Sequence, residues 1–455
     1  MMNFDDLASA LKGPLRGPGD DSFDDARRVW NARFDRRPDI IARCTDAADV
    51  ATAVDFARDH GLRLSVKSGG HSYAGTTIAD GGLLIDLSGM NSVHVDIDAG
   101  TATVGPGVTI GELDAATQAH GLATTGATVS SVGIAGFTLG GGSGYLARAF
   151  GLAVDRLLSA EIVTSDGQRI RAAENENGDL FWAIRGAGAN FGIATSLEFR
   201  LDRIGSDVLA GQIIYPFDEA GRMLRFFRDF MGEAPDELQV YPFMFKIPPI
   251  EAFPEPLHGK PVLDFVLCHL DAGANDVVQP LRELGEAILD SVGPMPYTVA
   301  QTGFDANLPN GRRYYSKAHD FAAIGDGVID SVVEWVPQMR GALSATYFDP
   351  SGGAIARVDP QATAFAGRQA LYGLHILAGW MDASEDDTVM GWARAFHEAL
   401  APHATGGVYV NLLADDEPDR VPSAYGENHA RLVELKGRWD PQNLFSANHN
   451  IAPPG

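Results

Sequence analysis

Residues 62–73, LRLSVKSGGHSY, lead a strand directly into a glycine turn that ends in a histidine. Leu62, Leu64 and Val66 alternate with polar residues, which is the period of a strand with one buried face. Glycine accepts a positive φ and lets backbone N–H groups approach a phosphate closely. The turn is therefore a candidate phosphate cradle, although a single Gly-Gly pair more often forms only a turn.

Two further glycine-rich segments follow this turn. The first reads GATVSSVGIAG over residues 126–136 and continues as GGGSG over 140–144, and the second reads RGAGANFG over 185–192. Neither has the GxGxxG pattern between a strand and a long helix, and the chain has no GxxxxGK[ST] loop. A dinucleotide site here must be of a type other than a Rossmann or P-loop site.

The elements around these segments indicate a compact α+β region. Thr45 is predicted to cap a helix over residues 46–60, and the capping box Thr109–Glu112 predicts a helix over 110–120. Asp166-Gly167 predicts a hairpin turn. Strands are expected at 62–66, 83–87, 93–96, 102–104, 161–165 and 168–172, and a short helix at 180–185.

The pattern changes near Ile204, after which the glycine clusters stop and the predicted strands become longer. Strands are expected at 208–215, 240–247, 262–270 and 371–380, and helices at 281–291, 327–340 and 386–400. This order fits a sheet covered by helices on one side. The last 50 residues contain a predicted strand at 408–413 and a helix at 429–438. We divide the chain into a lead-in (1–36), a first domain (37–205), a second domain (206–405) and a C-terminal segment (406–455).

The composition excludes several classes of partner. The chain has 455 residues and a net charge of -25, so its surface repels phosphate backbones and anionic lipids. Cys44 and Cys268 lack metal-ligand spacing, and we expect two buried thiols and no metal site. No basic leader with an apolar run and no apolar stretch of about 18 residues is present, which favours a cytoplasmic protein without a membrane-spanning helix.

The ordered motifs together resemble the FAD-linked oxidases of the vanillyl-alcohol oxidase fold, which have an FAD-binding domain of the PCMH type. Within that family they resemble the berberine-bridge-enzyme-like branch, and in character the bacterial members similar to 6-hydroxy-D-nicotine oxidase. The resemblance covers nearly the whole chain. It rests on the segments above and on DLFWAIRG (179–186), NFGI (190–193), YGEN (425–428), DP (440–441) and NHNI (448–451).

The resemblance implies one covalent bond, from His71 to the 8α-methyl group of FAD. Members with a second link carry a cysteine where this chain has Val129, and valine forms no thioether. Lys67 would pair with phosphate or with the charge of the reduced flavin, or else remain a solvated lysine. The resemblance implies that the cofactor is bound by Lys67, Ser68, Gly69, Gly70, His71, Ser72, Ser131, Val132, Gly133, Gly136, Gly140, Gly141, Gly144, Tyr145, Ile193, Asn411 and Asn448.

The catalytic strand departs from the family pattern. Many members that oxidise alcohols or sugars have a tyrosine base after an asparagine, whereas here Leu412 follows Asn411. Asn411 is expected to face the flavin, and Tyr409 is a candidate catalytic residue. A base could also come from Tyr315, Lys317 or His375.

The absence of that tyrosine shifts the expected substrate toward an amine or an aromatic metabolite. Hydride would pass to the flavin and then to O2, giving H2O2. The alternatives are a dehydrogenase, a sugar or alcohol oxidase with a relocated base, and a non-catalytic flavin-binding protein.

The substrate pocket is expected on one face of the second sheet. Tyr241, Phe243 and Phe245 alternate and share a face, although such a stripe is more often core. Tyr372 and His375 lie on opposite faces of another strand, so at most one of them points at the flavin. The candidate pocket residues are Phe243, Phe245, Tyr372 and His375.

Overall fold

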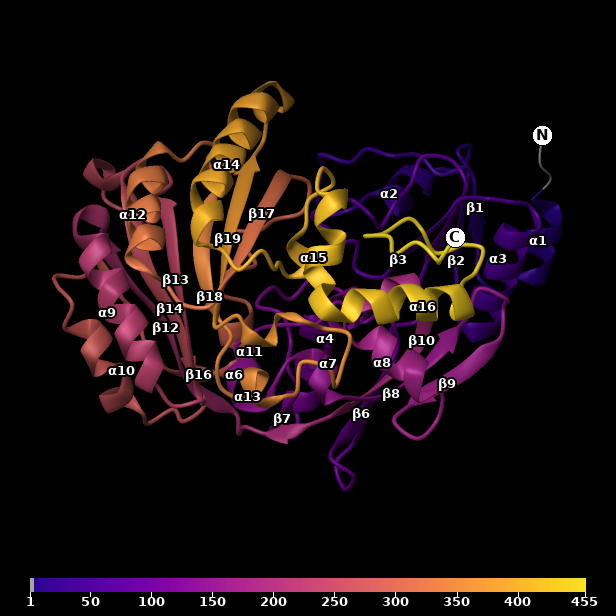
Figure 1. The fold of residues 1–455 in the computed structure, drawn as a ribbon, viewed down its shortest axis with the longest axis horizontal. Coiled ribbons are helices and arrows are strands. Elements are labelled where there is room, and N and C mark those ends of the chain that lie inside the picture. The colour runs from indigo at the N-terminus through magenta and orange to yellow at the C-terminus, as the bar shows by residue number, and fades with distance from the viewer. Residues whose placement is uncertain (1–3) are drawn as a thin grey trace.

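The computed structural model describes residues 4–455, which form two lobes, each built on its own β-sheet structure (Figure 1). The predicted α+β class is confirmed.

The predicted site comprises 22 residues, and three of them, Tyr409, Asn411 and Asn448, belong to the C-terminal segment that returns to the first lobe.

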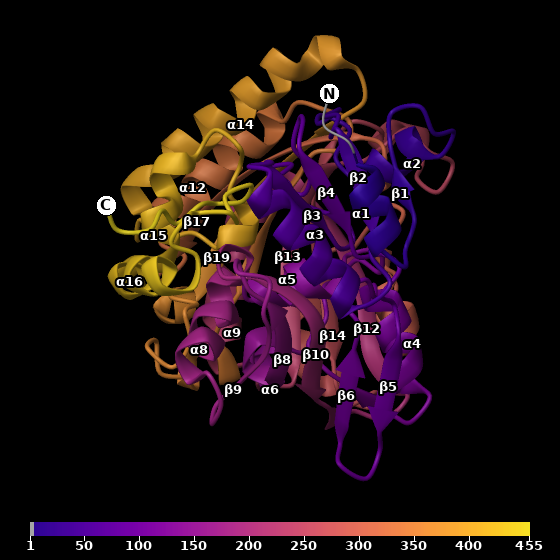
Figure 2. The same cartoon turned by 90° about the vertical axis from the view of Figure 1, so that its right-hand side faces the viewer.

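The first lobe holds a small, mainly parallel sheet and an antiparallel sheet, and Figure 2 shows the parallel sheet above the antiparallel one. Helix α3 (Ala47–Asp59) packs between the two sheets. The parallel sheet has the order β1 (Leu15–Arg16), β2 (Ile40–Arg43), β4 (Leu83–Asp86), β3 (Leu64–Lys67). The antiparallel sheet has the order β5 (Val93–Asp96), β6 (Thr101–Val104), β10 (Ile193–Arg200), β8 (Leu157–Val163), β9 (Arg169–Ala173).

Short helices and one further strand pair complete this lobe. The helices are α1 (Asp5–Ala10), α2 (Phe23–Arg27), α4 (Ile110–Gln118), α5 (Ile134–Leu139), α6 (Ala147–Phe150), α7 (Ala153–Arg156) and α8 (Gly178–Ala187), and β7 (Leu122–Ala123) pairs with β11 (Asp202–Arg203). The predicted capping box at Thr109 and Glu112 is confirmed.

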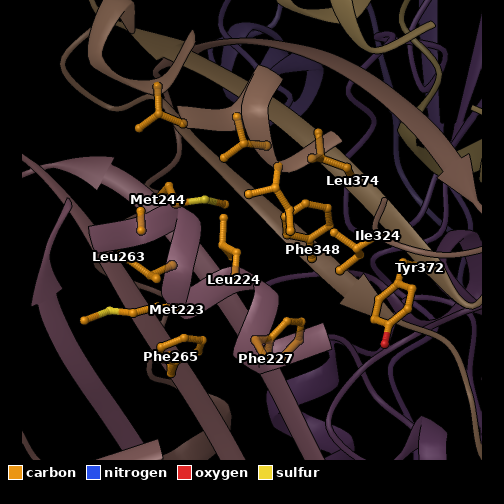
Figure 3. Packing of buried hydrophobic residues seen from close by; sticks show 14 of the residues in the cluster. Met223, Leu224, Phe227, Met244, Leu263, Phe265, Ile324, Phe348, Tyr372 and Leu374 are labelled. Carbon is orange, nitrogen blue, oxygen red and sulfur yellow. The ribbon is translucent and has the colours of Figure 1, made fainter. Parts of the chain in front are cut away.

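The second lobe is an antiparallel sheet with helices over one face (Figure 1). Its strands are β15 (Leu289–Asp290), β12 (Asp207–Pro216), β14 (Pro261–His269), β13 (Leu238–Lys246), β18 (Ala345–Pro350), β19 (Tyr372–Trp380) and β17 (Arg313–Phe321), with β16 (Gly293–Pro296) beside β12. The covering helices are α9 (Ala220–Glu233), α10 (Asn275–Arg282), α12 (Asp326–Trp335) and α14 (Asp386–Leu400), while α11 (Tyr297–Gln301) and α13 (Ala354–Arg357) are short connections. Figure 3 shows the apolar side chains between helices and sheet.

The C-terminal segment returns to the first lobe through α15 (Val421–Tyr425) and α16 (His429–Trp439). Lys436 lies on α16 and is fully buried. Its ammonium group donates to the carbonyl of Asn190 at 2.8 Å and to Asp440 at 2.7 Å. This buried pair fixes the end of the chain against the loop that follows α8.

Three predictions about local structure are wrong. Asp46, not Thr45, caps α3, because its carboxylate accepts from the N–H groups of Ala48 and Asp49. The predicted helix at 281–291 is instead the end of α10 followed by a turn and an irregular stretch that leads into β15. The predicted strand at 408–413 contains a 3-10 turn, Val410–Leu412, which has no strand partner because it packs on the glycine loops of the first lobe.

Strands β17 and β18 were not predicted. β17 reads RYYSKAHDF and is buried on both faces, so it does not show the alternation of apolar and polar residues that marks a strand with one exposed face. The two cysteines are buried thiols, as predicted. Within residues 4–455, no helix is long and apolar enough to cross a membrane, and no group of three acidic, histidine or cysteine side chains could hold a metal ion.

Candidate functional site

His71 lies at the end of the turn that follows β3. Gly70 has φ +71°, a conformation that glycine adopts without strain. His71 Nε2 lies 2.9 Å from Ser131 Oγ in the second glycine segment. The two segments that the sequence singled out therefore meet at this histidine.

Trp30 braces the His71 ring. The two rings stack with centroids 4.6 Å apart, and Trp30 stacks in turn on Tyr314 of β17 at 3.9 Å. The indole N–H donates to the carbonyl of Leu308 at 2.9 Å. Sequence reasoning missed Trp30 because it lies in the lead-in, within no motif.

His71 is electrically neutral near pH 7. Burial lowers its pKa to about 4, yet the side chain keeps partial exposure, as expected of a group that lines a crevice. Its Nδ1 atom forms no hydrogen bond within residues 4–455. A neutral imidazole with one free nitrogen is a nucleophile.

The glycines hold the two loops in backbone contact. A Cβ atom on Gly69 would lie 2.3 Å from the nitrogen of Gly133, and one on Gly133 would lie 2.4 Å from Ser68 Oγ. By contrast, a Cβ atom on Gly136 would meet nothing within 4 Å. The loops therefore touch at one point and leave open space beside α5.

The C-terminal segment closes over the second glycine segment. Asn411 donates to the hydroxyl oxygen of Tyr409 at 2.8 Å, and the N–H of Gly142 donates to the same oxygen at 2.8 Å. A Cβ atom on Gly140 would lie 2.1 Å from Asn411 Oδ1, and one on Gly141 would lie 2.9 Å from the Tyr409 ring. Burial raises the pKa of Tyr409, so its phenol stays protonated and is a poor base.

Other predicted cofactor residues lie around this point with different partners. Lys67 donates to the carbonyl of Ala26 and lies 3.5 Å from Asp86, so its charge is already paired. Ser72 bonds within its own loop, to Thr76 at 2.9 Å.

Three further predicted cofactor residues, Gly144, Tyr145 and Val132, lie near the border with the second sheet. A Cβ atom on Gly144 would lie 1.8 Å from the carbonyl oxygen of Gly126. Tyr145 contacts Tyr241 with ring centroids 5.7 Å apart, and Val132 packs against the same apolar cluster. These residues form part of the wall between the lobes.

The end of the chain offers hydrogen-bond acceptors without partners. Asn448 donates to the carbonyls of Ala189 at 2.6 Å and Phe445 at 3.1 Å, while its own Oδ1 is buried and unpartnered. Asn450 Oδ1 is also buried without a partner. Ile193 packs with Phe445 in the same region. Buried amide oxygens without donors fit a ligand that carries N–H or O–H groups.

We call the side of the second sheet opposite its helices the cleft face. His375 lies on this face, with Nδ1 2.9 Å from the Tyr347 hydroxyl and Nε2 2.9 Å from Ser316 Oγ. Ser316 donates its own proton to the carbonyl of Leu412, so it accepts from Nε2–H. Nδ1 is then the acceptor for Tyr347, which fixes the neutral tautomer of His375.

His375 lies where it could contact a ligand on the cleft face, but it is not suited to act as a base. Burial lowers its pKa to about 3, and both of its nitrogens are engaged. Tyr73, two residues after His71, contacts the His375 ring edge-on, with the ring centroids 5.2 Å apart. This contact links the His71 loop to the cleft face.

The prediction for Tyr372 is wrong. Its ring packs among the apolar side chains beneath α9, with Phe227 at 6.4 Å, as Figure 3 shows. Because neighbouring strand residues alternate between faces, only His375 of the predicted pair faces the cleft.

The two phenylalanines of β13 lie on the cleft face but differ in position. Phe243 stacks on Tyr347 at 4.4 Å and so supports the residue that bonds His375. Phe245 packs instead with Ile247 and Val262 near the end of the strand, and its role as a pocket residue stays a prediction.

The other candidate bases lie outside the cleft. Tyr315 donates to Asp416 at 2.7 Å, and Lys317 donates to the same carboxylate at 2.9 Å. Both residues alternate with Ser316 on β17 and therefore point to the opposite side of the sheet. Neither can take a proton from a ligand beside His375.

A cavity of about 40 Å³ lies where the cleft face meets the first lobe and the C-terminal segment. Its walls include Ser143, Asp320, Asp349, His375, Tyr409 and Leu412. A larger open groove of about 640 Å³ is lined by Thr45, Asp46, Met90, Ser92, Arg169 and Ser196, and it contains none of the predicted site residues. Of these two, only the small cavity contains predicted site residues, so we take it as part of the candidate active site.

The two-sheet lobe, the touching glycine loops and the neutral histidine define a flavin-dependent oxidoreductase. Residues 38–173 match the family model described as FAD binding domain, and residues 408–452 match the one described as berberine and berberine like. The two matches cover the histidine loop and the returning C-terminal segment.

Characterised relatives extend over nearly the whole chain. (R)-6-hydroxynicotine oxidase from Paenarthrobacter nicotinovorans is 31% identical, with 98% of each chain covered. Chitooligosaccharide oxidase from Gibberella zeae is 29% identical, with 97% of this chain and 93% of the relative covered. The crystal structure of 6-hydroxy-D-nicotine oxidase from Arthrobacter nicotinovorans superposes with a TM-score of 0.88 at 30% identity, covering 98% of both chains. The chain belongs to the berberine-like family of FAD-linked oxidases.

Proposed function

We propose that this protein is an oxidase that carries FAD on His71 and takes hydride from a small amine. The environment of His71 supports the covalent link: the imidazole is neutral, it stacks on Trp30, and its Nδ1 atom forms no hydrogen bond within residues 4–455. A protonated imidazole has no lone pair for the bond, so the low pKa keeps the nucleophilic form present at neutral pH.

The residues present fit FAD. The open space beside Gly136 and the unpartnered amide oxygens of Asn448 and Asn450 suit a ligand with phosphates, hydroxyls and ring N–H groups. When bound, the cofactor supplies the hydride acceptor. Asn411 would lie beside it, and Ser131 would hold the His71 ring. With Val129 at the cysteine position, only the histidine can form a link.

The poor basicity of the three residues expected nearest the flavin, Tyr409, Leu412 and His375, favours an amine. An alcohol must lose a proton as hydride leaves, whereas a neutral amine carries its own electron pair. Leu412 cannot accept a proton, Tyr409 stays protonated, and His375 is a weak base with both nitrogens engaged. The relative named as a 6-hydroxynicotine oxidase agrees with this class.

A sugar or alcohol oxidase with a relocated base is the second candidate. It is favoured by the carboxylates of Asp320, which is buried, and Asp349, which is half-buried, whose pKa values are raised to about 7, and by the relative named as a chitooligosaccharide oxidase. A carboxylate with that pKa is a competent base near neutral pH.

The test of the cofactor link compares wild type with His71→Ala and with His94→Ala, which changes an exposed strand histidine. The absorption spectrum is recorded before and after acid precipitation, together with the intact mass. We expect yellow colour and the added mass of one FAD in the wild-type and His94→Ala pellets, and neither in the His71→Ala pellet. Colour that acid releases from wild type would contradict the covalent link.

The test of the substrate class is anaerobic reduction of the flavin by secondary amines and by oligosaccharides. We expect bleaching by amines, and H2O2 formation when oxygen is readmitted. Bleaching by oligosaccharides alone would favour the second candidate, and no bleaching by any compound would favour a non-catalytic flavoprotein.

A further inference from the structure

Two carboxylates flank a glycine on the cleft face. Asp320 of β17 and Asp349 of β18 both pair with Gly373 of the intervening strand β19. A Cβ atom on Gly373 would lie 3.9 Å from Asp320 Oδ1 and 3.9 Å from Asp349 Cβ. The missing side chain therefore leaves the two acidic groups facing one space.

These carboxylates have no cation. Within residues 4–455 neither forms an ion pair, and the Asp320 side chain forms no hydrogen bond although only 9% of the residue is exposed. Asp349 accepts a long hydrogen bond from Gln239 at 3.3 Å. Arg420 acts on Asp320 from a distance, but its guanidinium is bound to Glu417 at 2.6 Å.

The same molecule pairs comparable buried charges elsewhere. Arg368 bonds Asp155 at 2.6 Å, and Lys436 bonds Asp440 at 2.7 Å. Burial raises the pKa of Asp320 and of Asp349 to about 7, since a buried carboxylate without a partner is costly. A bound cation would remove that cost.

The carboxylates line the cavity that also contains His375, Tyr409 and Leu412. Its volume of about 40 Å³ is close to the space of one small polar group, since a water molecule takes about 30 Å³ in the liquid. The cavity thus fits one ammonium-sized group next to the residues that surround the candidate reaction centre.

We propose that Asp320 and Asp349 form a cation subsite that binds a charged nitrogen of the substrate, distinct from the neutral amine nitrogen next to which hydride is lost. This inference rests on the proposed function and names its substrate class: small compounds with a basic nitrogen. The two carboxylates supply the charge, and Gly373 supplies the room between them.

The test uses the FAD-loaded protein and two probes of similar size, benzylamine, which is a cation at neutral pH, and neutral benzyl alcohol. Calorimetric titration measures their affinities for wild type, Asp320→Asn and Asp349→Asn. Asp264→Asn is the matched control, because Asp264 is a buried carboxyl on the same sheet face that does not line the cavity.

Wild type should bind benzylamine at least about tenfold more tightly than benzyl alcohol. Each single variant should lose about tenfold in benzylamine affinity and keep its affinity for the alcohol, as expected for a lost charge-assisted hydrogen bond. The control should retain both affinities. Equal binding of the two probes by wild type, or equal loss of both in the variants, would overturn the subsite.

The wild-type ratio decides the question even if a variant does not fold. The failure of the subsite is also distinct from that of the proposed function. A yellow protein that is bleached by oligosaccharides and does not prefer benzylamine lacks the subsite but keeps the cofactor. A colourless protein that still prefers benzylamine has the subsite without the proposed cofactor chemistry.

Discussion

Two regions of the molecule treat buried charge in opposite ways. Where the C-terminal segment meets the first lobe, Lys436 and Asp440 are both fully buried and bonded to each other. On the cleft face of the second sheet, Asp264 and Asp320 are buried and Asp349 is half-buried, and none of the three forms an ion pair within residues 4–455. Removing one partner of a buried pair leaves an uncompensated charge, whereas the unpaired carboxylates Asp320 and Asp349 line a cavity in which a ligand could supply the missing partner.

Breaking the buried pair is expected to give the largest effect. Lys436→Ala leaves Asp440 buried without its partner and removes donors to two carbonyls, which should lower the free energy of unfolding by about 3–5 kcal/mol. Urea unfolding measures this. The exposed Arg431→Ala on the same helix is the control. A loss as small as that of the control would mean that the pair does not anchor the segment.

Separating the glycine loops should have the next largest effect. Gly133→Ala places a Cβ atom 2.2 Å from the nitrogen of Gly69, so the loops must move apart, at a cost of about 3 kcal/mol. Gly136→Ala meets no atom within 4 Å and should leave the melting temperature of the cofactor-free protein unchanged. If Gly136→Ala nevertheless lowers the flavin content, the open space beside it belongs to the cofactor.

Neutralising an unpaired carboxylate should stabilise the protein, with a pH dependence of defined sign. Burial raises the pKa of Asp264 to about 8. The protonated carboxyl therefore contributes fully to the free energy of unfolding below about pH 4, and this contribution is lost as the pH rises toward 8. Asp264→Asn should therefore match wild type near pH 4 and exceed its free energy of unfolding at pH 8.5 by on the order of 2 kcal/mol. A difference that does not change with pH would contradict this reading.

The smallest effect is expected at Ser131. Ser131→Ala removes the hydroxyl 2.9 Å from His71 Nε2, at a cost of about 1 kcal/mol. Flavin should still bind, but acid should release a larger fraction of it, since the imidazole is less well oriented. The ratio of acid-soluble to acid-stable flavin measures this, and an unchanged ratio would show that Trp30 alone holds the ring.

Much of the cofactor lobe was predictable because its signals are local. The strand into Ser68-Gly69-Gly70-His71 and the capping box at Thr109 depend on neighbouring residues, and the structure has both. The wrong predictions, such as the strand over 408–413 and the pocket role of Tyr372, concern residues whose surroundings come from distant segments.

The sequence by itself determined the two-lobed α+β class, the glycine loops and the histidine between them, because backbone freedom and strand period are properties of short segments. Only the tertiary structure decided that Trp30 stacks on His71, that His375 and not Tyr372 faces the cleft, and that Asp320 and Asp349 share one cavity. Those facts depend on strand register and on burial, which arise from contacts between residues far apart in the chain.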